Sequence, residues 1–434
     1  MKSIFVTFGI LMFCSGFGAS RLKAAEQAQP NILIIFVDDM GYGDLGCYGS
    51  STQETPVLDQ LAEQGTRFTS FYAQTVCGPS RSALLTGRYP IRSKGWGMPA
   101  EELTFAELIK KSGYQTACIG KWDVSNRKPI VPRMPNAQGF DYYYGTLGAN
   151  DNGRVVFHEN NDEVGMTEDM ASLSRLYTDK AIEYLREKRQ PEKPFVLYVA
   201  HTMMHTIIDA SEPYLGTTEG GLYGDAVREL DSETGRLLET LDALELSGDT
   251  LVIFTSDNGP WNQLKYTSKK KGHPPGAIFW GSSGPLRNGK GSCYEAGYRV
   301  PGIVRWPGHV PSGRTSDAVI ATIDFLPTFA RLCGFEVPED RVIDGQDQTD
   351  LLLGKRDSGR PDFYFDRAGV RSGQWKYLKA DAHFHKYAVE DDRPAEEELY
   401  DLESDLGESR NLAKVHPEKV AEMRRLMRAI ENAR

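Results

Sequence analysis

Four apolar segments, each followed at once by charged, amide or imidazole side chains, constrain the fold of this chain most. They span residues 30–37, 116–120, 195–200 and 250–256. Segments that are apolar on both faces of the strand are typical of central strands in a parallel sheet, because helices cover both faces of such a sheet. Ligands bind beyond the carboxyl ends of these strands. The pattern therefore predicts one shared site at a single edge of a parallel sheet.

The side chains at these strand ends are oxygen donors, a lysine and two histidines: Asp38, Asp39, Lys121, His201, His205, Asp257 and Asn258. The three aspartates and the asparagine form a set of hard oxygen donors, which suits Ca²⁺ or Mg²⁺ better than Zn²⁺. The alternative interpretation is that each pair consists of turn residues after a strand. The residues by themselves leave both interpretations open.

Amphipathic segments separate the predicted strands. Apolar residues recur at helical spacing over 223–241, and shorter helical patterns occupy 56–62 and 104–111. This alternation predicts an α/β fold with a large, mostly parallel central sheet flanked by helices. Strand-like pieces in 362–379 and a charged amphipathic helix over 417–433 predict a small C-terminal α+β subdomain.

The first 25 residues have the pattern of a secretory signal peptide. A lysine is followed by an apolar run and then by small residues. About ten apolar residues are too few to span a bilayer. We therefore predict a secreted or periplasmic protein without a membrane anchor, with a signal peptide over 1–25, a main domain over 26–350 and the small subdomain over 351–434.

Charge and cysteine content limit the possible partners and crosslinks. A formal net charge of −10 argues against a nucleic-acid partner, but it is compatible with a local cationic pocket for a small anion. Five cysteines lie outside the predicted signal: Cys47, Cys77, Cys118, Cys293 and Cys333. Their pairing cannot be derived from the sequence. Cys118 lies in a predicted strand and is interpreted as a buried apolar residue.

Residues 77–88 read Cys-Gly-Pro-Ser-Arg-Ser-Ala-Leu-Leu-Thr-Gly-Arg and form a turn that leads into a helical segment. Cys77 would then lie at a helix N-terminus, where free N–H groups and the helix dipole favour an anion. Arg81 would add a positive charge from the same turn. The structural alternative is a buried cysteine near a surface arginine.

These residues resemble the signature of type I sulfatases, C-x-P-S-R-x-x-x-L-T-G-R, at every fixed position. Other motifs of that family are matched by 31–43, 113–122, 255–259, 284–301 and 398–412. The resemblance covers nearly the whole chain after the signal and implies the alkaline-phosphatase-like fold. It also implies that a formylglycine-generating maturation enzyme oxidises Cys77 to Cα-formylglycine (3-oxoalanine), whose hydrated aldehyde is the nucleophile.

The family also implies a role for each matching site residue. Its metal is calcium, with the ligands Asp38, Asp39, Asp257 and Asn258. Arg81 would pair with the hydrated formylglycine, Lys121 would hold a sulfate oxygen, and Lys290 would bridge the sulfate and the leaving group. His205 would donate a proton to the leaving-group oxygen, with His201 as the competing candidate.

One position departs from the family pattern. The usual G-K-W-H is replaced by Gly120-Lys121-Trp122-Asp123, so an aspartate occupies the place of a histidine that assists the formylglycine diol. Asp123 can accept a proton as a catalytic base, but it cannot carry a positive charge. An unpaired carboxylate would repel a sulfate, so we expect Asp123 to be protonated, paired with a cation or turned away from the site.

The resemblance implies hydrolysis of sulfate esters, with a sulfated carbohydrate as the expected substrate. Arg154 and Trp261, in the loop segments 150–154 and 261–280, are candidate substrate-binding residues together with His201. Two alternatives stay open. One is a phosphonate or phosphate-ester hydrolase of the same superfamily, and the other is a non-catalytic carbohydrate-binding relative.

Overall fold

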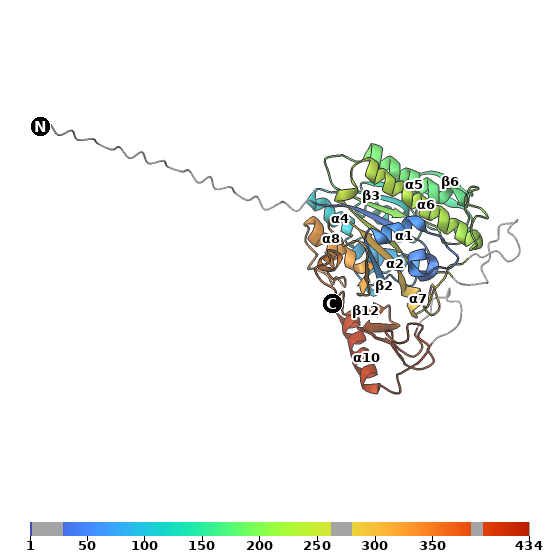
Figure 1. Ribbon diagram of the computed structural model, residues 1–434, viewed down its shortest axis with the longest axis vertical. Coiled ribbons are helices and arrows are strands. Elements are labelled where there is room, and N and C mark those ends of the chain that lie inside the picture. The colour runs from blue at the N-terminus through green and yellow to red at the C-terminus, as the bar shows by residue number, and fades with distance from the viewer. Residues whose placement is uncertain (2–28, 262–279, 383–393, 434) are drawn as a thin grey trace.

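The computed structural model describes residues 1, 29–261, 280–382 and 394–433 of the 434-residue chain. The predicted signal peptide (1–25) and most of the loop segment 261–280 lie outside the described residues. Figure 1 shows a large α/β body with a smaller C-terminal part at one end, where β12 and α10 are found.

Within the described residues, eleven strands form the central sheet. Their order from edge to edge is β10, β2, β9, β8, β1, β7, β3, β4, β5 and β6, and β11 pairs with β2. The bounds are β1 Asn31–Val37, β2 Thr66–Tyr72, β3 Gln115–Lys121, β4 Tyr142–Thr146, β5 Val155–Glu159, β6 Asp162–Thr167, β7 Phe195–Ala200, β8 Thr250–Ser256, β9 Arg299–Arg305, β10 Arg314–Ser316 and β11 Ile320–Ala321. The neighbours from β8 to β4 are parallel, whereas β9, β5 and β6 pair antiparallel. The predicted mostly parallel sheet is confirmed.

The four strands predicted from the apolar segments are β1, β3, β7 and β8, and they lie side by side in the sheet. Every residue of β1 is buried. Ile32 and Ile34 pack into the core on one face of the sheet, and Leu33 and Ile35 pack into the core on the other. Because both faces of β1 are covered by helices, its sequence is continuously apolar rather than alternating.

The main helices of the body divide between the two faces of the sheet. Residues of α1, α5 and α6 belong to one core, and residues of α2, α4 and α8 belong to the other. Figure 1 shows α5 and α6 running together along one face. The bounds are α1 Pro56–Glu63, α2 Cys77–Thr86, α3 Pro90–Ser93, α4 Phe105–Ile109, α5 Leu173–Glu183, α6 Gly221–Ala243, α7 Glu295–Tyr298, α8 Phe325–Cys333 and α9 Thr349–Leu352. These layers place the carboxyl ends of the central strands next to the start of α2.

The C-terminal part is a four-stranded antiparallel sheet with one helix, as the predicted α+β subdomain requires. Its elements are β12 Asp362–Phe365, β13 Gly369–Ser372, β14 Trp375–Leu378, β15 Glu398–Asp401 and α10 Pro417–Asn432. A third apolar core joins this sheet to the body, since Tyr72, Ala83 and Tyr89 pack into it. Within the described ranges, no helix has the length and apolar composition needed to cross a bilayer.

Candidate active site

The carboxyl ends of β8, β1 and β3 bring polar residues to one place. An Asp–Asp pair follows β1, an Asp–Asn pair follows β8, and a lysine ends β3; these residues are Asp38, Asp39, Asp257, Asn258 and Lys121. β1 pairs in parallel with β8, so the two pairs meet at the same sheet edge. One ligand atom each of Asp38, Asp39, Asp257 and Cys77 lies within 4.8 Å of the others. The structure thus brings Asp38, Asp39, Asp257 and Cys77 together at this sheet edge.

Cys77 is the first residue of α2, so the N-terminal N–H groups and the dipole of this helix are directed at the site. Its Sγ lies 3.2 Å from Asp38 Oδ1 and 3.3 Å from Lys290 Nζ, and the residue is 2% exposed. Trp96 covers Gly78, where an added Cβ would lie 2.4 Å from the indole ring. Glycine is therefore required at this position for the indole to pack beside Cys77.

Three cations are paired with the three carboxylates around Cys77. Lys121 Nζ lies 2.5 Å from Asp38 Oδ2, and Lys290 Nζ lies 2.6 Å from Asp39 Oδ1. Arg81 donates to Asp257 Oδ2 at 2.8 Å. All of these side chains are at most 3% exposed. Buried charges are tolerated here because each has an opposite partner. We call Cys77 and these six residues the Cys77 cluster.

The cluster changes the titration of its members. Burial and the carboxylates of Asp257 and Asp38 raise the pKa of the Cys77 thiol well above its usual range. A thiol that stays protonated at neutral pH is a weak nucleophile. Burial alone would raise the pKa of the Asp38 carboxyl, but the charges of Lys121, His205, Arg81 and Lys290 together outweigh it and hold that pKa well below its usual range.

The donors at the ends of β1 and β8 fit a hard divalent cation. Asn258 Nδ2 donates to Asp39 Oδ1 and to the Gly259 carbonyl, at 2.7 and 2.9 Å. Its Oδ1 is buried and has no hydrogen-bond partner among the described residues. An amide oxygen left open beside three carboxylates is the kind of donor that completes an oxygen-ligated Ca²⁺ or Mg²⁺ site. The four predicted ligands could therefore hold such an ion.

His205 is 2% exposed and faces the same cluster. Its Nδ1 lies 2.6 Å from the Thr206 carbonyl, which can only accept, so Nδ1 carries the proton and Nε2 faces the site. Nε2 lies 3.8 Å from Asp39 Oδ2 and 3.4 Å from Asp151 Oδ1. Burial and the charge of Lys290 lower the pKa of His205.

Asp123 is fully buried, and its carboxylate is paired with a cation, which is one of the three states expected from the sequence. Oδ1 accepts from Arg127 Nε at 2.7 Å, and Oδ2 accepts from Trp96 Nε1 at 3.0 Å. Lys121 Nζ lies 3.7 Å from the same carboxylate. Both oxygens of Asp123 are therefore engaged by neighbouring side chains.

The remaining candidate substrate residues lie in different surroundings. Trp261 is buried, with its ring 4.8 Å from Lys290 Nζ and 5.7 Å from the ring of His205. His201 is fully buried against Tyr177, and neither ring nitrogen has a partner in the described part of the chain; burial lowers its pKa to about 4. Arg154 is exposed just before β5. Residues 262–279 of the predicted loop lie outside the described residues.

Arg127, Asp151 and Trp96 contact the site but were not identified as individual site residues from the sequence. Arg127 NH1 donates to Asp151 Oδ2 at 2.6 Å, and Asp151 lies beside His205. Asp151 falls within the loop segment proposed for substrate contacts. Arg127 stands in a loop with no motif, and its one sequence signal is the spacing of four residues from Asp123.

Replacement of Asp123 by asparagine tests the pairing with Arg127. We expect Asp123→Asn to lower the free energy of unfolding by about 1–3 kcal/mol, because it weakens buried charge-assisted hydrogen bonds. We expect kcat to fall by less than the 10²–10⁴-fold typical of a lost general base. Urea denaturation and steady-state kinetics measure the two effects. A loss of 10²-fold or more in kcat with unchanged stability would contradict this expectation.

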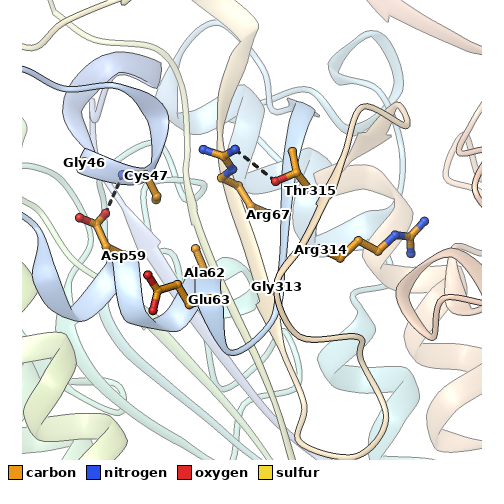
Figure 2. A pocket seen from close by; sticks show the side chains of 9 residues that line it. All are labelled: Gly46, Cys47, Asp59, Ala62, Glu63, Arg67, Gly313, Arg314 and Thr315. Carbon is orange, nitrogen blue, oxygen red and sulfur yellow. Dashed lines mark hydrogen bonds between the residues drawn. The ribbon is translucent and has the colours of Figure 1, made fainter.

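A pocket lies elsewhere in the body. This pocket of about 360 Å³ is lined by Gly46, Cys47, Asp59, Ala62, Glu63, Arg67, Gly313, Arg314 and Thr315. Figure 2 shows two hydrogen bonds between its lining residues, with Asp59 accepting from the Cys47 backbone and Arg67 donating to Thr315. It shares no residue with the Cys77 cluster, and burial raises the pKa of Cys47 to about 12.

Comparisons with known proteins agree with this geometry. The family described as Sulfatase matches residues 30–335, and that described as N-sulphoglucosamine sulphohydrolase, C-terminal, matches residues 289–433. The N-acetylgalactosamine-6-sulfatase of Canis lupus familiaris is 37% identical over 404 residues, which cover 84% of this chain and 74% of the relative. The steryl-sulfatase of Homo sapiens is 32% identical over 436 residues, which cover 79% of this chain and 73% of the relative.

The chain is also similar to a solved structure, with a TM-score of 0.83 and 30% sequence identity. That structure is described under the metabolism of multiple glycosaminoglycans by Bacteroides thetaiotaomicron. The alignment covers 94% of this chain and 100% of that chain.

Proposed function

Since the chain belongs to the sulfatase family and is a sulfuric ester hydrolase, we propose that it hydrolyses sulfate esters of a carbohydrate. The names of two similar proteins refer to sugars: one is an N-acetylgalactosamine-6-sulfatase, and the other is described under the metabolism of glycosaminoglycans. The observation that carries the proposal is Cys77 at the N-terminus of α2 within reach of Lys290, Asp38 and Asp39. An anionic ester group is favoured by this combination of helix N-terminus and buried cations.

The nucleophile in this proposal is formylglycine produced from Cys77 by a formylglycine-generating maturation enzyme. Its hydrated aldehyde would attack the sulfur of the ester. The high pKa of the unmodified thiol is consistent with the need for such a modification. Arg81, whose guanidinium also donates to the Lys121 carbonyl at 3.1 Å, is held rigidly beside residue 77.

The cations and His205 have distinct roles. Lys290 contacts Cys77 Sγ, and Lys121 is paired with Asp38, which contacts the same sulfur; both lysines would bind sulfate oxygens there. His205 presents Nε2 to the site and would donate a proton to the departing sugar oxygen. The carboxylates of Asp151 and Asp39 would stabilise the protonated ring. Trp261 packs against both Lys290 and His205 and would limit their side-chain motion.

We further propose that Asp38, Asp39, Asp257 and Asn258 hold a calcium ion. A bound divalent cation would supply positive charge that binds sulfuryl oxygens. The three carboxylates of the cluster are already balanced by Lys121, Lys290 and Arg81. Added cation charge would thus give the Cys77 cluster a net positive charge, which suits an anionic substrate.

Addition of Ca²⁺ to chelator-treated protein should raise the melting temperature. Ligand at 100-fold its dissociation constant stabilises a folded protein by about 2.7 kcal/mol. Asn258→Ala removes the open Oδ1 and should weaken Ca²⁺ binding at least tenfold by calorimetry. Asn432→Ala, at the exposed end of α10, is the matched control and should bind normally. No shift with millimolar Ca²⁺ or Mg²⁺ would refute the metal site.

Export is part of the same proposal, since the pattern of residues 1–25 is that of a secretory signal. A secreted or periplasmic location would give the enzyme access to extracellular sulfated polysaccharides.

The function is tested by assaying protein that has been co-expressed with a maturation enzyme. Sulfate release is measured from a panel of monosulfated sugars and from an aryl sulfate, with an aryl phosphate and a phosphonate monoester as competing substrates. We expect sulfate esters to be preferred and at least one sugar to be cleaved. Cleavage of the aryl sulfate without cleavage of any sugar sulfate would refute the proposed carbohydrate substrate. A preference for phosphorus esters would refute the proposed sulfatase function altogether.

A further inference from the structure

The loop after β3 carries an unusual density of strained backbone. Asp123, Asn126 and Arg127 have φ values of 56°, 55° and 57°, a left-handed conformation that non-glycine residues rarely adopt. Such residues persist where the surrounding contacts hold them, and they cluster at active sites and ligand clamps. The strain therefore indicates that the positions of Asp123 and Arg127 are fixed by their contacts.

Arg127 connects two loops of the site. Its Nε donates to Asp123 beside the Cys77 cluster, and its NH1 donates to Asp151 beside His205. Its aliphatic stem lies against Gly148, where an added Cβ would be 3.6–3.7 Å from it. NH2 has no bonded partner among the residues the structure describes. The guanidinium is thus oriented by two carboxylates and keeps one donor group for a ligand.

Arg127 and Asp151 are also the accessible part of this network. Their side chains are 39% and 36% exposed, whereas Asp123 is fully buried and His205 is 3% exposed. A substrate whose ester reaches Cys77 would place the atoms next to its leaving oxygen near His205. Asp151 and Arg127 therefore lie where the rest of the substrate has to be.

We propose that Arg127, with Asp151, is a specificity-determining pair that recognises free hydroxyl groups of the sugar next to the sulfate ester. This inference rests on the proposed action on sulfated carbohydrates. Arg127 NH2 donates to one hydroxyl oxygen, and a carboxylate oxygen of Asp151 accepts from a neighbouring hydroxyl. An adjacent pair of donor and acceptor matches a diol, because each sugar hydroxyl both donates and accepts.

The charges favour a hydroxyl over a second anion. The guanidinium of Arg127 is shared between the carboxylates of Asp123 and Asp151, so this edge of the site carries no net positive charge. A second sulfate or a uronate placed there would meet Asp151 and be repelled. Buried or partly buried groups that bond a substrate hydroxyl discriminate strongly against analogues that lack it.

The test compares the matured wild-type enzyme with Arg127→Met, Arg127→Lys and Lys128→Met. Lys128 is the matched control, because it is exposed in the same loop and its side chain has no partner among the described residues. The substrates are 4-methylumbelliferyl sulfate, the best sugar from a panel of monosulfated hexoses and N-acetylhexosamines, and the deoxy analogues of that sugar next to the sulfate. Thermal melting checks that each variant is folded.

Hydrogen bonds to charged groups correspond to roughly 10- to 100-fold in an equilibrium or rate. We expect Arg127→Met to lower kcat/KM for the sugar by that factor and to lower the sugar-to-aryl ratio at least tenfold. Arg127→Lys keeps the positive charge but loses the planar, forked geometry of the guanidinium. Its kcat/KM for the sugar should therefore lie between those of the wild type and Arg127→Met. One deoxy analogue should be a roughly 10- to 100-fold poorer substrate for the wild type, but nearly equal to the parent sugar for Arg127→Met. Lys128→Met should match the wild type.

Equal losses for the sugar and the aryl sulfate would overturn the inference, since Arg127 would then be only structural. Wild-type enzyme that cleaves the sugar and all its deoxy analogues equally well would also overturn it, without the need for any variant. Wild-type enzyme that cleaves the aryl sulfate but no sugar would instead overturn the proposed carbohydrate function, and the inference with it.

Discussion

Cys77→Ser is expected to abolish sulfate-ester hydrolysis in a host that cannot oxidise serine, with a loss of kcat on the order of 10⁴- to 10⁶-fold. The substitution replaces the thiol, which maturation removes as Cβ is oxidised to the aldehyde, with a hydroxyl of nearly the same size. Cys77 is 2% exposed and sits at the first position of α2, so serine fits without disturbing the helix. The comparison is made on an aryl sulfate with both proteins co-expressed with the maturation enzyme.

Cys47→Ser is the matched control for this experiment. Cys47 is a free, half-buried cysteine that lines the pocket shown in Figure 2, and this pocket shares no residue with the Cys77 cluster. It should therefore keep kcat within about twofold of the wild type. Full activity in Cys77→Ser, or an equal loss in both variants, would contradict the assignment of the nucleophile.

Lys376→Met is expected to destabilise the protein by about 3–5 kcal/mol, the cost of removing one partner from a buried ion pair. Lys376 Nζ, on β14, lies 3.1 Å from Glu295 Oε1 and 2.7 Å from Glu408 Oε1. All three side chains are fully buried. The substitution would leave two neighbouring carboxylates without their shared cation, and urea denaturation measures the loss.

Glu295 begins α7, so this ion pair links the small C-terminal sheet to the segment that follows Lys290. Lys379→Met, one residue beyond β14, is the control and should change the free energy of unfolding by at most about 0.5 kcal/mol. The double variant Lys376→Met with Glu408→Gln should recover part of the loss. A cost below about 1 kcal/mol for Lys376→Met would show that the buried cluster is not needed for stability.

The sequence was most informative where burial dictates composition. β1 packs against helices on both faces, so its residues from Ile32 to Val37 are all apolar and the polar pair after them marks the end of the strand. The same logic identified β3, β7 and β8, and the parallel sheet then brings their ends together. The antiparallel strand β9, which pairs with both β8 and β2, has no such signal. Its position depends on tertiary pairing rather than on local pattern.

The site residues likewise divide into those that the sequence could predict and those that it could not. The residues at strand ends and in the helix-initiating motif could be predicted, because sheet topology and helix termini determine where they lie. The pairing of Asp123 with Arg127 and Trp96 could not, because it depends on left-handed backbone in an irregular loop. Lys376 gave no sequence signal for its partners, since Glu295 and Glu408 are distant in the chain.

The most direct test of the account is to measure activity against the extent of maturation at residue 77. Preparations with different levels of the maturation enzyme are analysed by peptide mass spectrometry for thiol, aldehyde and hydrate at this position, and kcat is measured on an aryl sulfate. We predict that kcat rises in proportion to the fraction of formylglycine and extrapolates to near zero for the pure thiol. Full activity in a preparation that contains only unmodified Cys77 would contradict the proposed mechanism.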